Sequence, residues 1–190
     1  MPVRLFEELY YLAHGSNLDS ILDQGILSHN EVIRRGLRPV DVSNPGVQLR
    51  RARIEPVFGR PVHDYAPLYF NPRNPMLYAL QALQNELVIL VVRLEVLTEH
   101  DHIYTDGNAA SSVTIFAKHH FYSLAASEVL GAHAWTNLPD GRRRRCAEVL
   151  VYPEVAPKYI ARGVCRNPSL VSQIRGRCGL PVSLDSSMFF

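Results

Sequence analysis

The chain has 190 residues, of which 47% are hydrophobic and 20% are charged, and its formal net charge is +2 at pH 7. This composition is ordinary for a soluble globular protein. The length allows one domain with a substantial core and is marginal for two, so we predict a single domain over residues 1–190.

The cysteines and the apolar runs indicate a soluble protein of a reducing compartment. Cys146, Cys165 and Cys178 are odd in number, lie far apart and show no CxxC spacing. They therefore argue against a disulfide framework or a cysteine-based zinc site. The most apolar run, residues 87–97, is too short to span a bilayer and contains two charged residues. We expect a cytoplasmic protein that does not contact a membrane.

The first third of the chain predicts two short elements and then a long loop. Residues 9–14 are typical of a strand that ends in a histidine. In the next segment, SNLDSILDQG, Ser16 and Asp19 form a capping box and Gly25 suits the end of a helix. From residue 28 to residue 67 the apolar pattern breaks up among turn residues. A loop of this length in a small domain is usually functional or disordered.

The remaining elements mix strands and helices without a repeated βαβ unit, which predicts an α+β fold. Residues 113–140 are ambiguous between helix and loop. The other predicted elements are a strand at 67–72, a helix from the Asn74 cap, a buried strand at 86–96, a turn at 104–112, strands at 147–152 and 158–167, and a helix from the Asn167 cap.

Several common catalytic motifs are absent from the sequence. There is no Gly-rich phosphate loop after a strand, no HExxH and no G-x-S-x-G elbow. The eight histidines show no convincing ligand spacing, so we expect no metal site. The arginines form two clusters, one at residues 50–53 and one at 142–145, which suggests a local site for a polyanion. Either cluster taken alone is equally compatible with a solvated loop.

Polar residues at the ends of elements form a more informative set. His14 ends a strand, and Gly15 and Ser16 begin a helix, where backbone N–H groups favour an anion. Taken alone, His14 is better explained as a structural histidine, and Glu148 as a partner of the preceding arginines. Together they suit a polyanionic cofactor and a reaction that develops positive charge on a sugar. A single carboxylate beside such a transition state is the electrostatic device of glycosyl transfer.

Five segments resemble, in order, the DarT family of DNA-modifying ADP-ribosyltransferase toxins. They are LAHGSNLDSILDQGILS, VQLRRA, LYFNPRNPMLYA, YTDGNAASS and RRRRCAEVLVY, and the similarity covers roughly residues 8–165. The resemblance implies a compact ADP-ribosyltransferase fold: a split, strongly bent β-sheet with an NAD cleft and flanking helices. It implies transfer of ADP-ribose from NAD to thymine or guanine in single-stranded DNA, with release of nicotinamide. The partner implied is a macrodomain antitoxin that removes the modification.

The resemblance also implies roles for individual residues. Glu148 matches the catalytic glutamate, and Arg51 matches the functional arginine better than Arg50 does. Arg51 is expected to contact the phosphates of the cofactor and to help polarise the base. The residues expected to bind the cofactor are His14, Gly15, Ser16, Gly25, Leu27, Arg51, Met76 and Tyr78. Those expected to meet DNA are His119, His120, Tyr122, Arg142, Arg143, Arg144 and Arg145.

The chain departs from the family pattern after DGNAAS, where it reads VTIFAKHH in place of a T-R-F continuation. The missing arginine leaves the modified base open, with a slight preference for guanine. Two other hypotheses remain. One is an enzyme of the same fold that modifies RNA, tRNA or a protein side chain. The other is a non-enzymatic nucleic-acid-binding module that uses the two arginine clusters and releases no nicotinamide.

Overall fold

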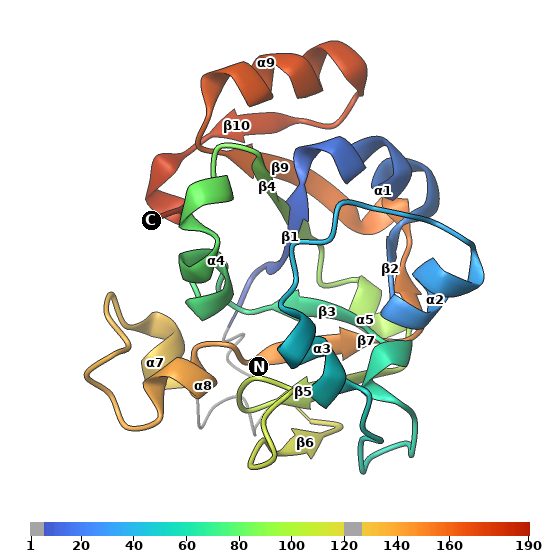
Figure 1. The fold of residues 1–190 in the computed structure, drawn as a ribbon, viewed down its shortest axis with the longest axis vertical. Helices are drawn as coiled ribbons and strands as arrows, with labels where there is room; N and C mark the ends of the chain where they lie inside the picture. Colours follow the sequence, from blue (N-terminus) through green and yellow to red (C-terminus); the bar gives the residue numbers. More distant parts are fainter. Residues whose placement is uncertain (1–5, 120–126) are drawn as a thin grey trace.

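The computed structural model describes residues 6–119 and 127–190, which form a mixed α+β structure (Figure 1). The strands of these segments are β1 (Leu9–His14), β2 (Ile26–Leu27), β3 (Ala66–Tyr69), β4 (Leu87–Val92), β5 (His102–Thr105), β6 (Phe116–Ala117), β7 (Glu148–Val151), β8 (Glu154–Val155), β9 (Ile160–Cys165) and β10 (Val182–Leu184). The helices are α1 (Leu18–Gln24), α2 (His29–Arg34), α3 (Pro45–Arg51), α4 (Pro75–Ala79), α5 (Val96–Glu99), α7 (Ser127–Gly131), α8 (Gly141–Arg144) and α9 (Pro168–Arg177).

Within the described residues, eight strands form one sheet in the order β10-β9-β4-β1-β3-β7-β5-β6. Strand β1 pairs with β4 along its whole length but with β3 only at Tyr10 and Tyr69. Because a single residue pair joins the two halves, the sheet splits and bends at this point. Figure 1 shows β1 and β4 running steeply while β3 and β7 run across the view. The α+β class and the split, bent sheet implied by the resemblance are confirmed.

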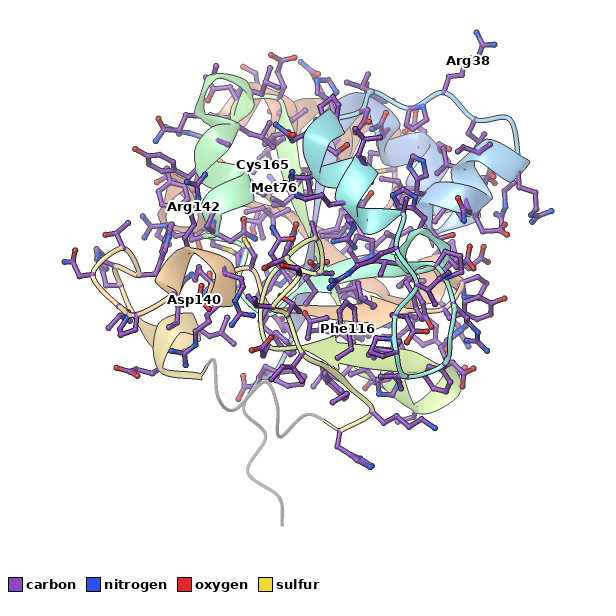
Figure 2. The ribbon with its side chains drawn as sticks, turned by 60° about the horizontal axis from the view of Figure 1, so that its bottom comes forward. Arg38, Met76, Phe116, Asp140, Arg142 and Cys165 are labelled. Carbon is purple, nitrogen blue, oxygen red and sulfur yellow. The ribbon has the colours of Figure 1, made fainter. Side chains whose placement is uncertain are left out.

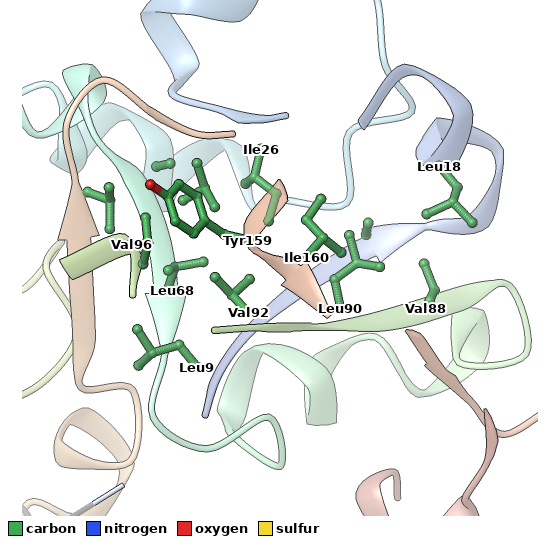
Figure 3. Packing of buried hydrophobic residues seen from close by; sticks show 14 of the residues in the cluster. Leu9, Leu18, Ile26, Leu68, Val88, Leu90, Val92, Val96, Tyr159 and Ile160 are labelled. Carbon is green, nitrogen blue, oxygen red and sulfur yellow. The ribbon is translucent and has the colours of Figure 1, made fainter. Parts of the chain in front are cut away.

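The buried strand β4 explains why residues 86–96 carry an unbroken apolar run. Side chains alternate between the two faces of a strand. On one face Val88, Leu90 and Val92 pack in the largest core cluster with residues of β7, β9 and α9 (Figure 3). On the other face Leu87 and Ile89 pack in a second cluster, which includes residues from α4 and the C-terminus. The strand is apolar throughout because neither of its faces meets water.

The segment at residues 28–67, predicted as a long loop, contains two helices. Helix α2 begins after Ser28, whose hydroxyl accepts the N–H of Glu31 at 3.2 Å. Helix α3 begins with Asn44 as its N-cap and Pro45 in its first turn. This is the same start signal that correctly predicted α4 from Asn74. The surrounding turn residues hid it, and the two helices are only 6 and 7 residues long.

The capping box predicted at Ser16 and Asp19 is wrong. A short 3₁₀ turn (Gly15–Asn17) precedes α1, so the N-cap is Asn17, one residue later, and the N–H of Ser16 donates to the His14 ring. The prediction for Gly25 is confirmed, because this residue caps the C-terminus of α1 with φ of 94°. A Cβ there would lie 2.4 Å from the carbonyl oxygen of Val155, so the β2–β8 pair also requires glycine.

Across the segments that the structure describes, none of the helices is both long and apolar enough to cross a membrane.

Candidate active site

A large cleft opens beside the split in the sheet. It has a volume of about 1500 Å³ and is lined by residues of β1, β3, α3, α4 and α8 and by the segment between α2 and α3. Clefts that hold drug-sized ligands measure roughly 300–1000 Å³. The size therefore allows a dinucleotide together with part of a second substrate.

Glu148, the first residue of β7, is 1% exposed and lies behind Arg51, which lines this cleft and reaches the Glu148 carboxylate. Thr105 of β5 fixes its backbone, since the Thr105 hydroxyl accepts the N–H of Glu148 at 2.9 Å. The carboxylate is held separately, because the N–H of Ala109 donates to Oε1 at 2.9 Å. Both contacts come from the segment YTDGNAASS, so this segment positions the carboxylate.

Arg51 is the ion-pair partner of Glu148 in the described chain. Its Nη1 lies 3.0 Å from Oε1 and 2.9 Å from Oε2 of Glu148, although the two residues are 97 positions apart in the sequence. Both side chains are buried, at 9% and 1% exposure. Arg50, the competing candidate, is exposed on the lining of the cleft. Arg51, and not Arg50, thus contacts Glu148, and its contacts with the cofactor stay a prediction.

The groups around Glu148 remain protonated and leave it as the anionic centre of this region. Burial and the nearby Glu148 charge raise the pKa of Tyr69 well above its usual value, and its hydroxyl lies 3.2 Å from the sulfur of Met76. Burial, followed by Glu148, raises the pKa of the Cys146 thiol to about 12. A thiol with so high a pKa is a poor nucleophile at neutral pH. Cysteine chemistry is therefore not what this site supports.

Both ring nitrogens of His14 have partners at the end of β1. Its Nδ1 accepts the N–H of Ser16 at 3.2 Å and lies 2.7 Å from the Ser16 hydroxyl oxygen. Its Nε2 lies 3.1 Å from a carboxylate oxygen of Glu86. The ring lines the cleft and is held from both sides.

The segment between α2 and α3 is fixed over the cleft by one asparagine. The Asn17 side chain donates to the carbonyl of Val40 and accepts its N–H, both at 2.9 Å. Val42 packs in the second core cluster beside Met76. Arg38, earlier in the same segment, lies on the lining of the cleft with its guanidinium projecting toward solvent (Figure 2). Asn17 thus connects α1 to the wall of the cleft, a contact that no local sequence pattern predicts.

Comparison with known proteins identifies the family. The family described as "ssDNA thymidine ADP-ribosyltransferase, DarT" matches residues 10–190. A DNA ADP-ribosyl transferase–DNA ADP-ribosyl glycohydrolase fusion protein of Thermosipho africanus is 35% identical over 193 residues, which cover 97% of this chain. The chain belongs to the DarT family.

Solved DarT structures share this fold. Thermosipho africanus DarTG in complex with ADP-ribose is 32% identical, with a TM-score of 0.86 over 97% of this chain and 51% of the other. Thermus sp. 2.9 DarT in complex with ADP-ribosylated ssDNA is 24% identical, with a TM-score of 0.79 over 97% of this chain and 96% of the other. The chain spans 50% of the length of the Thermosipho fusion protein.

The residues predicted to bind the cofactor of a DarT enzyme divide into two groups in the structure. His14, Leu27, Arg51 and Met76 line the cleft. The others lie outside its lining: Gly15, Ser16, Gly25 and Tyr78.

Three of these outlying residues have structural explanations of their own. A Cβ on Gly15 would lie 2.9 Å from the Leu170 side chain under α9. Gly25 is needed for the close approach of β8. Tyr78 is 56% exposed and packs edge-on against Phe190 at 5.3 Å between ring centroids. Contacts between these residues and the cofactor remain predictions.

The four arginines before Glu148 do not share one role. Arg145 is 4% exposed, and its guanidinium donates to the carbonyl oxygens of Arg73, Val129, Leu130 and Ala132 at 2.7 to 2.9 Å. Arg145 thus has a structural explanation of its own, because its side chain holds α7 and the Arg73 turn together. Its predicted contact with DNA stays a prediction. Burial, followed by the Arg73 charge, lowers the pKa of Arg145 to about 10.

Arg143 is also largely structural, since its guanidinium binds Asp106 and Asp140 at 2.5 to 3.0 Å. It ties α8 to the loop that holds Glu148. Arg142 is exposed and lines the cleft, and Arg144 is half-buried. Arg142 is thus the member of the run best placed to meet an incoming strand.

The histidines and tyrosine predicted to contact DNA are only partly within the described segments. His119 is exposed in the stretch that follows β6. His120 and Tyr122 lie outside the described residues.

Proposed function

We infer that this chain transfers ADP-ribose from NAD to a base in single-stranded DNA. The observation that carries the proposal is the buried Glu148 carboxylate, which is held by the Ala109 N–H and by Arg51, a residue that lines a large cleft. The DarT family description, which names ADP-ribosyl transfer to single-stranded DNA, supports this chemistry. The Thermosipho relative is likewise described as a DNA ADP-ribosyl transferase.

The cleft fits a dianionic dinucleotide. Its lining contains Arg38, Arg50, Arg51, Arg53 and Arg142, so it is rich in positive charge. Its apolar lining includes Met76 and Leu80 from the α4 region, a suitable surface for a planar ring. His14 offers a fixed imidazole at the same end. When bound, NAD supplies the ADP-ribosyl group and the nicotinamide leaving group.

Glu148 is suited to stabilise positive charge on a sugar. Its Oε1 already accepts hydrogen bonds from Arg51 and Ala109, whereas its Oε2 accepts only from Arg51 among the described residues. A carboxylate oxygen has two acceptor positions, so Oε2 keeps one for a ribose hydroxyl. In a buried site a fixed carboxylate stabilises a developing cation far more than it does in water. We propose that the Glu148 carboxylate also takes the proton lost by an attacking base nitrogen once the ribose hydroxyl has left it.

Thymine is the first base to test, because the matching family is described by thymidine. The sequence alone slightly favoured guanine, and that preference stays an untested prediction. Single-stranded DNA is a sensible acceptor in either case, because duplex pairing hides the Watson–Crick edge of the base.

The cellular role follows from the same family. The Thermosipho relative joins a DNA ADP-ribosyl transferase to a DNA ADP-ribosyl glycohydrolase in one protein. We propose that this chain is the toxin of a toxin–antitoxin pair and that its partner is a macrodomain glycohydrolase that reverses the modification. Reversal is testable by adding such a glycohydrolase to modified DNA and following loss of the ADP-ribose mass.

One experiment separates the candidate acceptors. The protein is incubated with isotopically labelled NAD and, in parallel, with single-stranded DNA, RNA and a protein mixture, and label transfer and nicotinamide release are measured. We expect label on DNA, and digestion to nucleosides followed by mass spectrometry identifies the base. Label on RNA or protein alone would favour another acceptor for the same fold. Salt-sensitive DNA binding without nicotinamide release would favour a binding module and overturn the proposal.

A further inference from the structure

Arg53, just beyond α3, carries a positive charge that the described residues do not balance. Two of its three guanidinium nitrogens, Nε and Nη2, are shielded from solvent and have no hydrogen-bond partner among them. Arg53 also lines the cleft. A shielded cation without a partner is costly, so such a group in a cleft indicates an anionic ligand.

The position of Arg53 is fixed rather than free to seek a partner. Its carbonyl accepts the N–H of Val62 at 2.9 Å. Its guanidinium lies over the ring of Phe116, with 4.9 Å between Cζ and the ring centroid. Burial, followed by the nearby Arg51 charge, lowers its pKa, which means that the neighbouring groups increase rather than neutralise the positive potential. A fixed and unneutralised guanidinium is a preorganised receptor for phosphate.

The sheet order decides which substrate this receptor faces. Strand β7, which carries Glu148, stands between β1, which ends in His14, and β6, which carries Phe116. Arg53, packed on Phe116, therefore lies toward the β6 edge of the sheet, on the side of Glu148 away from His14, which is predicted to bind the cofactor. Two groups exchanged at one sugar carbon approach and leave on different sides of it, so the Arg53 side is the side of the acceptor.

Exposed apolar residues occur at the same edge. Ile54 follows Arg53 and is 59% exposed, and Ile115 precedes Phe116 and is 48% exposed. Val113, in the same loop, is 68% exposed. Single-stranded DNA binds where cationic groups that hold its backbone are combined with apolar or aromatic surfaces that pack against its bases.

We propose that Arg53, backed by Phe116, forms a binding subsite for a backbone phosphate of the acceptor strand next to the modified base. This inference rests on the proposed function, because it assumes that the acceptor is a nucleic acid strand. It makes Arg53 a binding residue for the acceptor and not for NAD.

The main test compares Arg53→Gln with wild type and with Lys158→Gln. Lys158 is exposed and pairs with Glu99 away from the cleft, so its variant removes one charge without touching the site. Binding of a short fluorescent single-stranded oligonucleotide is measured without NAD over a range of salt concentrations. We expect Arg53→Gln to weaken binding by about tenfold or more, because a hydrogen bond to a charged group is lost. The slope of log K against log salt should fall by about 0.7, the value for one phosphate contact on a single strand. Lys158→Gln should match wild type in its affinity for the oligonucleotide and in this slope.

Two further measurements locate the phosphate and exclude NAD as its source. Oligonucleotides with one neutral methylphosphonate linkage are scanned along the strand. One linkage next to the modified base should weaken binding to wild type but not to Arg53→Gln. The KM for NAD in nicotinamide release should be the same in both proteins, since only acceptor binding is changed.

Each result decides between the claims. Wild-type binding by Arg53→Gln overturns the subsite, and so does a raised KM for NAD with unchanged DNA binding, which assigns Arg53 to the cofactor. If wild type transfers no ADP-ribose to DNA, the proposed function fails, whatever Arg53 does. Thermal unfolding controls for folding: losing an unbalanced cation should not lower the melting temperature of Arg53→Gln. If it does, Arg53→Lys, which keeps the charge, should retain the salt slope, and a lost slope contradicts the subsite.

Discussion

The two arginine clusters of this chain differ in what surrounds them. In the run at residues 142–145, Arg145 and Arg143 are saturated by carbonyl and carboxylate oxygens and hold α7, α8 and the loop before β6 together. In the cluster at residues 50–53, Arg51 holds the Glu148 carboxylate and Arg53 is unbalanced at the cleft. The run at residues 142–145 is thus the more conspicuous cluster in the sequence, but two of its members mainly hold the fold together. An arginine is informative about function when the fold leaves its guanidinium without enough partners.

The largest expected effect is at Arg51, which belongs to the cluster at residues 50–53 and pairs with the Glu148 carboxylate. Arg51→Gln leaves Glu148 buried without its cation. Breaking a buried ion pair in this way costs about 3–5 kcal/mol of the free energy of unfolding. Denaturant unfolding measures this loss directly. The double variant Arg51→Gln with Glu148→Gln should recover part of it, and a double variant that is less stable than the single one would contradict the pairing.

Arg145 should show nearly as large an effect, but on stability alone. Arg145→Met removes the donors for one buried and three part-buried carbonyl oxygens and is expected to cost about 3 kcal/mol or more of the free energy of unfolding. Urea unfolding of the variant provides the measurement. At a temperature where the variant stays folded, its affinity for single-stranded DNA should equal that of wild type. A stable variant with weakened DNA affinity would restore Arg145 to the DNA interface.

Arg142 is expected to behave in the opposite way. Because its side chain is exposed, Arg142→Gln should change the free energy of unfolding by less than about 0.5 kcal/mol. It should weaken binding of single-stranded DNA and reduce its salt dependence, as the loss of one phosphate contact does. Fluorescence anisotropy at several salt concentrations measures this. If Arg142→Gln and Arg145→Met changed the free energy of unfolding and the DNA affinity equally, Arg142 and Arg145 would not have the different roles inferred here.

The smallest expected effect is on the pH dependence of stability, through His63, which lies near Arg51 of α3. Burial, followed by His29 and Arg51, lowers the pKa of His63, while Gln48 and Asp64 act in the opposite direction. As the pH falls, His63 therefore becomes protonated in the unfolded chain before it does in the folded protein. The contribution of neutral His63 to stability is present above about pH 6.5 and is lost as the pH falls through that value toward the folded pKa. His63→Gln should thus gain melting temperature relative to wild type between about pH 7 and about pH 5. A constant difference would contradict the assignment.

Sequence patterns identified Glu148 and Arg51 because short motifs mark both residues. They also predicted β1, β4 and α4, since apolar periodicity and the Asn74–Pro75 start are local signals. The separate roles of the arginines could not be predicted. The partners of Arg145 are backbone carbonyls, and carbonyls leave no mark in a sequence.

Contacts between distant segments were also beyond prediction. The Thr105 contact that fixes the Glu148 backbone spans 43 positions, and the Asn17 contact with Val40 spans 23. Such contacts depend on how the bent sheet brings loops together. Helix α3 was missed for a different reason, because Asn44–Pro45 carried a start signal that neighbouring turn residues obscured.

The central claim is that Glu148 catalyses transfer of ADP-ribose to DNA. The most direct test is the mass of a single-stranded oligonucleotide after incubation with NAD and wild type, Glu148→Gln or Glu99→Gln, an exposed control outside the cleft. Wild type and Glu99→Gln should add one ADP-ribose, whereas Glu148→Gln should be about a thousandfold slower while binding DNA normally. Transfer by Glu148→Gln at the wild-type rate, or unmodified DNA with wild type, would contradict the claim.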